Sequence, residues 1–138
     1  MGQLVANPYI NFQGRAREAM TFYQAAFGGT LDLLAFDEGG APRPANQNDA
    51  IMHSRLAADG VTIMATDGMP TYPPTVGDNM AITVVGSDRE RLTTIFTKLS
   101  EGGMVKQALK EESWGDTFGY FTDKFGINWM IDITKEDR

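Results

Sequence analysis

The segment at residues 15–29 has the sequence RAREAMTFYQAAFGG, and its apolar side chains recur at the spacing of an α-helix. Gly28 and Gly29 follow the last apolar residue, and glycine commonly ends helices because it adopts a left-handed backbone without steric cost. The sequence therefore predicts a helix over residues 15–27 that ends at this glycine pair. The face expected to be buried consists of Ala16, Ala19, Met20, Tyr23, Ala26 and Phe27.

A second segment, DRERLTTIFTKLSEGG at residues 88–103, has the same design. Ser87 and Glu90 have the spacing of a capping box, in which each side chain accepts a hydrogen bond from the other's backbone N–H. The sequence predicts a second helix over residues 88–101, which also ends at two glycines, Gly102 and Gly103. Its apolar stripe consists of Leu92, Ile95, Phe96 and Leu99.

Each predicted helix follows a short apolar stretch, at residues 9–13 and 80–85, and precedes three strand-like segments separated by turn residues. The last hairpins also match, since GVTIM at residues 60–64 is similar to GINWM at residues 126–130. The order strand, helix, strand, strand, strand therefore occurs twice. Such a repeat indicates duplication of a unit that cannot bury its own sheet face alone.

The two copies differ in length. The glycine pairs are 74 residues apart (28 to 102) but the hairpins only 66 (60 to 126), so the first copy has about eight extra residues, expected within residues 37–49. The proline-rich residues 67–78 are the expected connector between module one, about residues 5–67, and module two, about residues 78–135. Because each half alone would have a thin core, we expect a single domain over residues 1–138.

The composition excludes several classes of protein. The chain has 138 residues and no cysteine, so disulfides, thiolate metal sites and cysteine nucleophiles are excluded. Its apolar runs are far shorter than the roughly 20 residues of a membrane helix, and its first five residues lack the pattern of a secretory signal. The 12 basic residues are dispersed among 18 acidic ones, which argues against nucleic-acid binding. We therefore expect a cytoplasmic protein that binds neither membrane nor nucleic acid.

Several motifs occur in an order that resembles the PhnB-like family of the glyoxalase/bleomycin-resistance/dioxygenase (vicinal oxygen chelate) superfamily. They begin with YINFQG at residues 9–14 and Met52-His53, and together they cover nearly the whole chain. The remaining motifs are Glu18-Ala19, Phe22-Tyr23, Phe27-Gly28-Gly29, Asp67-Gly68-Met69-Pro70, Trp114-Gly115-Asp116, Phe118-Gly119, Thr122-Asp123-Lys124-Phe125-Gly126 and Trp129-Met130-Ile131.

The resemblance implies an α+β, glyoxalase-like fold of two tandem βαβββ modules, whose strands form a curved, cup-like mixed sheet with the helices outside. It also implies a homodimer. It implies no particular activity: family members often carry a methyltransferase label, but no glycine-rich nucleotide loop follows a predicted strand here. We therefore expect no cofactor.

In the glyoxalase enzymes of this superfamily, four His or Glu side chains from the first and last strands of the modules hold a divalent metal in the cup. The resemblance places at these positions Asn7 or Pro8, Met64, Asn79 or Met80, and Met130. A thioether is a soft, neutral ligand that is poorly suited to a hard divalent ion. We therefore expect no metal, and we interpret Met64 and Met130 as adaptable apolar lining.

The two tryptophans are expected to differ in role. If Met130 faces the cup, alternation along the strand turns Ile127, Trp129 and Ile131 toward the helices, so Trp129 is expected in the core. Trp114 lies in a polar turn at residues 112–116. It either packs locally or covers the cup mouth or a dimer partner.

The leading hypothesis is a protein that binds a small apolar or aromatic molecule in a metal-free cup. His53, the only histidine, is the one weak candidate for a catalytic residue, as a general base near neutral pH. The alternative is a metal-dependent lyase, isomerase or dioxygenase-type enzyme with non-standard ligands, such as His53 with Asp67, Asp116 or Asp132. A purely structural dimeric module is a third. The residues expected to bind the small molecule are Asn11, His53, Met64, Trp114, Asn128 and Met130.

Overall fold

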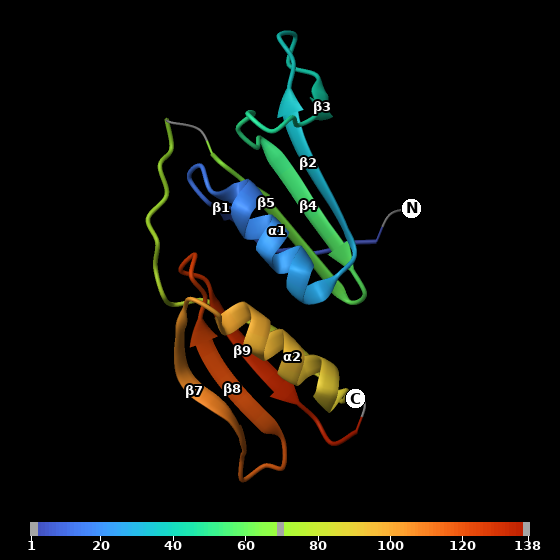
Figure 1. Cartoon of the computed structure of the whole chain (residues 1–138), viewed down its shortest axis with the longest axis vertical. Coiled ribbons are helices and arrows are strands. Elements are labelled where there is room, and N and C mark those ends of the chain that lie inside the picture. Colours follow the sequence, from blue (N-terminus) through green and yellow to red (C-terminus); the bar gives the residue numbers. More distant parts are fainter. Residues whose placement is uncertain (1–2, 69–70, 137–138) are drawn as a thin grey trace. The chain divides into compact units, whose positions relative to one another are not determined.

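The computed structural model describes residues 3–68 and 71–136, so Met69 and Pro70 of the expected connector, and Met1 and Gly2 of the N-terminus, lie outside the described residues. The chain forms two compact units, Met1–Thr75 and Val76–Arg138 (Figure 1). Each unit contains its own helix and its own sheet. The boundary between the units falls within the proline-rich segment that was predicted to be the connector.

The first unit consists of β1 (Tyr9–Asn11), α1 (Ala16–Phe27), β2 (Thr30–Phe36), β3 (Pro42–Pro44), β4 (His53–Ala58) and β5 (Val61–Thr66). Its five-stranded sheet has the order β1-β5-β4-β2-β3. β1 runs parallel to β5, and the other neighbouring strands are antiparallel. The sheet is therefore mixed, and α1 lies across one of its faces (Figure 1).

The second unit consists of β6 (Ile82–Gly86), α2 (Arg89–Ser100), β7 (Met104–Glu111), β8 (Thr117–Thr122) and β9 (Asn128–Ile133). Its four-stranded sheet has the order β6-β9-β8-β7. β6 runs parallel to β9, as β1 does to β5, and the other pairs are antiparallel. The two units are thus copies of one βαβββ arrangement, which confirms the predicted α+β fold.

One element was not predicted, and one predicted detail is wrong. The strand β3 lies within residues 37–49, where the extra residues of the first copy were expected, and it forms because β2 extends beyond β4 and pairs its last residues, Leu34 to Phe36, with Pro42–Pro44. The second helix is capped by Asp88 and not by Ser87. Asp88 has an extended backbone, and its carboxylate accepts a hydrogen bond of 3.1 Å from the Arg91 N–H, so the helix begins one residue later than predicted.

Each helix buries its apolar face against its own sheet, as the periodicity predicts. Trp129 and Ile131 of β9 are fully buried, which confirms the side of the strand assigned to them. In the first unit the buried apolar residues include Ala16, Ala19, Met20, Tyr23, Phe27, Leu56, Ile63 and Ala65. In the second unit they include Leu92, Ile95, Phe96, Leu99, Phe121, Trp129, Ile131 and Ile133.

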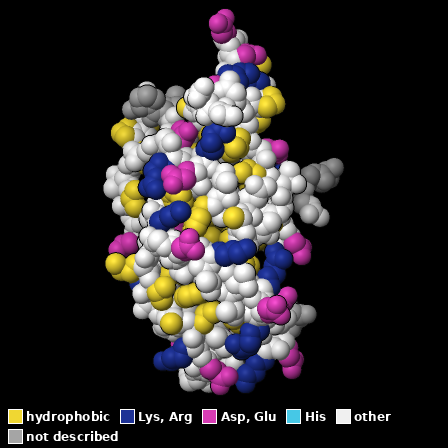
Figure 2. All heavy atoms as spheres, in the orientation of Figure 1, with side chains coloured by type: hydrophobic (Ala, Val, Ile, Leu, Met, Phe, Trp, Pro, Cys, Tyr) yellow, Lys and Arg dark blue, Asp and Glu magenta, His cyan; other side chains and the backbone are white. Residues whose placement is uncertain are grey.

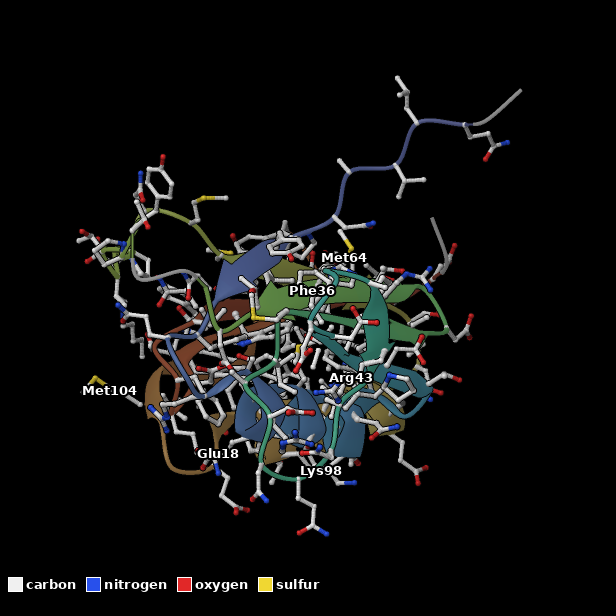
Figure 3. All side chains as sticks on the ribbon, turned by 90° about the horizontal axis from the view of Figure 1, so that it is seen from above. Glu18, Phe36, Arg43, Met64, Lys98 and Met104 are labelled. Atoms are coloured by element: carbon white, nitrogen blue, oxygen red, sulfur yellow. The ribbon has the colours of Figure 1, made fainter. Side chains whose placement is uncertain are left out.

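The opposite face of each sheet is not covered by that unit's helix. In Figure 3, Met64 and Phe36 lie on the side of the first sheet away from α1, whereas Glu18 and Arg43 lie on the side of α1. We call these surfaces the first and second open faces. The first includes Tyr9, Asn11, Asp32, His53, Arg55 and Met64, and the second includes Thr83, Phe118, Tyr120, Met130 and Asp132.

The view in Figure 2 shows acidic and basic side chains mixed with small apolar areas, without an extended basic area on the face in view. Among the described residues, no helix is both long and apolar enough to cross a membrane.

Candidate functional site

The first open face is organised around Met64. The sheet register places Tyr9 of β1 on one side of Met64 and Arg55 of β4 on the other, with Asp32 of β2 opposite Arg55. Tyr9 is 51% exposed and Met64 is half-buried. An aromatic ring, a thioether and a guanidinium therefore form one row across the sheet.

His53 lies on the same face and contacts Tyr9. The Tyr9 hydroxyl is 3.1 Å from His53 Nδ1, and the ring centroids are 5.7 Å apart with an angle of 30° between the planes. Tyr9 comes from β1 and His53 from β4, with β5 between the two strands. The contact thus bridges a strand and fixes both rings over the same part of the sheet.

Asn11 has a local role. Its side-chain oxygen accepts a hydrogen bond of 2.9 Å from the Gln13 N–H, which stabilises the turn into α1, where Gln13 has a positive φ of 51°. A side chain at Gly68 would collide with the Asn11 amide, so the Asn11 side chain packs directly against the backbone of Gly68, which follows β5. The structure brings Asn11, His53 and Met64 onto one face, but the Asn11 oxygen is engaged by backbone.

The second open face is organised around Met130 in the same way. The register places Thr83 of β6 and Tyr120 of β8 on either side of Met130. Phe118 lies on the same face of β8, opposite Asp132. Met64 and Met130 therefore occupy equivalent positions in the two units, as the similarity of the two hairpins predicts.

Asn128 is buried, and its side chain holds neighbouring segments of the second unit together by hydrogen bonds. Its side-chain NH₂ donates to the backbone oxygens of Asp78 at 3.3 Å and Met80 at 3.1 Å, and its side-chain oxygen accepts from the Thr122 hydroxyl at 2.6 Å. These bonds fix the chain that leads into β6. Both amide hydrogens of Asn128 thus have backbone partners, so the residue predicted to contact a ligand holds the strand entry in place.

Trp114 is 60% exposed and lies in the turn between β7 and β8. Its ring contacts Phe118 edge to face, with centroids 6.3 Å apart. Trp114 is therefore not a core residue, and it extends the aromatic surface that begins at Phe118. Trp129, by contrast, is fully buried and donates from Nε1 to the Asp123 carboxylate at 2.9 Å.

The residues of the first strands that lie beside Met64 and Met130 in the register are Tyr9 and Thr83. Asn7 and Pro8 precede β1, and Asn79 and Met80 precede β6. Neither pair offers an imidazole or carboxylate, and no group of three or more His, Cys, Asp or Glu residues suited to a metal occurs among residues 3–68 and 71–136.

Of the non-standard ligands considered from the sequence, Asp67 is engaged by backbone N–H groups. The two Asp67 carboxylate oxygens accept hydrogen bonds from the Ala16 N–H at 2.8 Å and the Ile51 N–H at 2.7 Å. Asp116 is buried immediately before β8, in the second unit, and Asp132 lies on the second open face. Asp67 therefore ties α1 to the chain before β4, and it is not paired with His53 in the hydrogen bonds of the described residues.

A shallow groove of about 670 Å³ lies along the N-terminal half of α1, where it meets residues 47–50. Two of its charged side chains have partners: Arg17 donates to the backbone oxygens of Asn46 and Asp49, and Asp49 forms a 2.7 Å ion pair with Arg43. A hydrogen bond from the Arg43 guanidinium lowers the pKa of the Asp49 carboxyl. These contacts order the extra loop of the first unit.

The fold and its open faces define the class of protein: two βαβββ modules in tandem, which is the glyoxalase fold. Solved members of the glyoxalase/bleomycin resistance/dioxygenase superfamily share this fold with the chain. A family model described as 3-demethylubiquinone-9 3-methyltransferase matches residues 5–132, and the chain belongs to this family.

Individual relatives are similar along their whole length. Protein PA1353 from Pseudomonas aeruginosa is 36% identical, with a TM-score of 0.81 over 96% of this chain and 98% of that one. The putative 3-demethylubiquinone-9 3-methyltransferase, PhnB protein, from Bacillus cereus is 22% identical, with a TM-score of 0.74 over 95% and 100%. Protein YjdN of Escherichia coli strain K12 is 28% identical over 94% of this chain and 95% of its own.

The family description names a methyltransferase, and such chemistry requires a methyl donor. Nucleotide-like donors commonly bind where a helix N-terminus meets the end of a parallel strand. In this chain the Asp67 carboxylate occupies the N-terminus of α1, and the Asp88 carboxylate occupies that of α2. Each unit has a single parallel strand pair, at one edge of its sheet. The described residues therefore do not fit that mode of cofactor binding.

Proposed function

We propose that the protein binds a small apolar or aromatic molecule on its open sheet faces, without the metal of the superfamily's enzymes. The observation that carries this proposal is the placement of Met64 and Met130. They occupy equivalent positions at the centre of the two open faces, and each lies beside an aromatic side chain, Tyr9 or Tyr120. The resemblance to the superfamily implies that its enzymes have metal ligands at these two positions.

The chemistry of these side chains suits an apolar ligand. Methionine is flexible and polarisable, and it makes favourable contacts with aromatic rings. Burying about 100 to 150 Å² of an aromatic ligand would contribute roughly 3 to 4 kcal/mol before the costs of association. Trp114, at 60% exposed, and Phe118 add aromatic surface to the second open face.

The proposal predicts that a charge at either methionine weakens binding. Met64→Glu and Met130→Glu would place a carboxylate where an apolar ring binds, and we expect each to weaken the binding of a neutral aromatic probe, N-phenyl-1-naphthylamine, by about tenfold or more, equivalent to about 1.4 kcal/mol. Fluorescence titration measures the affinity directly.

Thr94→Glu is the matched control, because it adds the same charge at an exposed position of α2, away from both open faces. We expect wild-type affinity for this variant. If wild type does not bind the probe, or if all three variants bind it as wild type does, the proposal is wrong. The homodimer and the cytoplasmic location implied earlier stay predictions.

A further inference from the structure

The first open face differs from the second in carrying a histidine and an arginine next to its methionine. Tyr9, His53, Arg55 and Met64 come from three adjacent strands, β1, β5 and β4, and point to the same side of the sheet. The hydroxyl of Tyr9, the imidazole of His53 and the guanidinium of Arg55 therefore lie on the same face as the Met64 thioether. Such a surface offers a ligand polar contacts as well as apolar ones.

The contact with Tyr9 determines what His53 offers a ligand. If the Tyr9 hydroxyl donates to Nδ1, the neutral imidazole carries its proton on Nε2 and presents an N–H donor to a ligand. If Nδ1 donates to the Tyr9 oxygen, Nε2 is an acceptor in the neutral ring and a donor in the charged ring. His53 therefore offers a donor to an acceptor oxygen in two of these three arrangements, and an anionic ligand favours those two.

Arg55 provides the charge. Its side chain is exposed, and it forms no hydrogen bond or ion pair with any residue in the described part of the chain. Asp32 lies directly opposite on β2, yet the two groups are not within 4.0 Å of each other. In a chain with a net charge of −6, a guanidinium that is not neutralised by a carboxylate is a local site of attraction for an anion.

We propose that the ligand of the first open face is an aromatic molecule that carries an anionic oxygen group, such as a carboxylate or a sulfonate. The ring contacts Met64 and Tyr9, the anionic group accepts hydrogen bonds from the Arg55 guanidinium, and the His53 Nε2–H is a second donor to it. This inference rests on the proposed function, because it names the class of ligand that the same surface binds.

Two fluorescent probes test the inference. 8-Anilinonaphthalene-1-sulfonate and N-phenyl-1-naphthylamine share one aromatic body and differ in the sulfonate. Wild type is expected to bind the sulfonate more tightly than the neutral probe. Arg55→Gln is expected to weaken sulfonate binding about tenfold and to leave the affinity for the neutral probe unchanged.

Two further variants complete the test. Arg15→Gln removes an equal charge from α1, where Arg15 pairs with Glu18, and is expected to leave both affinities unchanged. Asp32→Asn removes a negative charge opposite Arg55 and is expected to strengthen sulfonate binding about two- to threefold, an effect reduced by salt. Circular dichroism of each variant checks that the fold is retained.

The outcomes separate the two proposals. If both probes bind equally, or if Arg55→Gln and Arg15→Gln lower sulfonate binding alike, the anionic ligand class is wrong while the binding of aromatic molecules stands. If neither probe binds wild type, the proposed function fails, and the inference fails with it.

Discussion

Gly29→Ala and Gly103→Ala are each expected to lower the free energy of unfolding by about 3 kcal/mol or more. Each glycine follows a helix and passes against the backbone of a strand in its own unit. A Cβ at Gly29 would collide with Ala57 O and lie 2.7 Å from Ala58 Cα, and one at Gly103 would collide with Thr122 O and lie 2.9 Å from Asp123 Cα. Backbone atoms within a sheet cannot move aside. Urea unfolding followed by circular dichroism measures the loss.

Gly28→Ala is the matched control. Gly28 has a φ of 76° and a ψ of −156°, but nothing lies within 4 Å of the position its Cβ would occupy. The cost of alanine there is only that of a backbone conformation almost confined to glycine, about 1 to 3 kcal/mol. If Gly28→Ala destabilises the protein as much as Gly29→Ala, then backbone conformation, and not the close approach of helix end and strand, explains the glycine pairs.

Asp123→Ala is expected to cost about 3 to 5 kcal/mol of unfolding free energy. The Asp123 carboxylate is 3% exposed and accepts three hydrogen bonds, from the Phe125 N–H at 2.8 Å, the Ile127 N–H at 3.0 Å and Trp129 Nε1 at 2.9 Å. Alanine would leave these three donors without this acceptor, including the indole N–H of a fully buried tryptophan. Thermal unfolding measures the effect, with an expected fall in Tm of about 10 °C or more.

Asp59→Ala provides the comparison for this prediction, because Asp59 is exposed in the turn between β4 and β5. A surface substitution of this kind is expected to change the unfolding free energy by less than about 0.5 kcal/mol. Equal stability losses for the two variants would show that the hydrogen bonds of Asp123 are not what holds the turn between β8 and β9.

Most of the fold follows from short-range patterns in the sequence. The apolar spacing of residues 15–27 and 88–101 predicts both helices, and alternation in the last hairpins predicts that Trp129 is buried. Short-range patterns did not predict β3, because Pro42–Pro44 form a strand only by pairing with the end of β2. Such a strand is created by its neighbour and has no periodicity of its own.

The candidate site was predicted less completely than the fold. The resemblance to the superfamily identified Met64 and Met130, but Tyr9 and Arg55 were missed, because their neighbours on the sheet are set by the register between strands. Asn128 was predicted to contact a ligand, whereas its amide hydrogens bond to the backbone oxygens of Asp78 and Met80. An asparagine has the same appearance in a sequence whether it binds a ligand or the backbone.

The most direct test of the metal-free binding proposal is native mass spectrometry with elemental analysis, applied to the full chain purified without an affinity tag or a chelator. The account predicts no stoichiometric divalent metal, and a complex with a retained organic molecule or with added N-phenyl-1-naphthylamine. Stoichiometric zinc, nickel or manganese that is lost in His53→Ala would contradict it and would support a metal-dependent enzyme with His53 among its ligands.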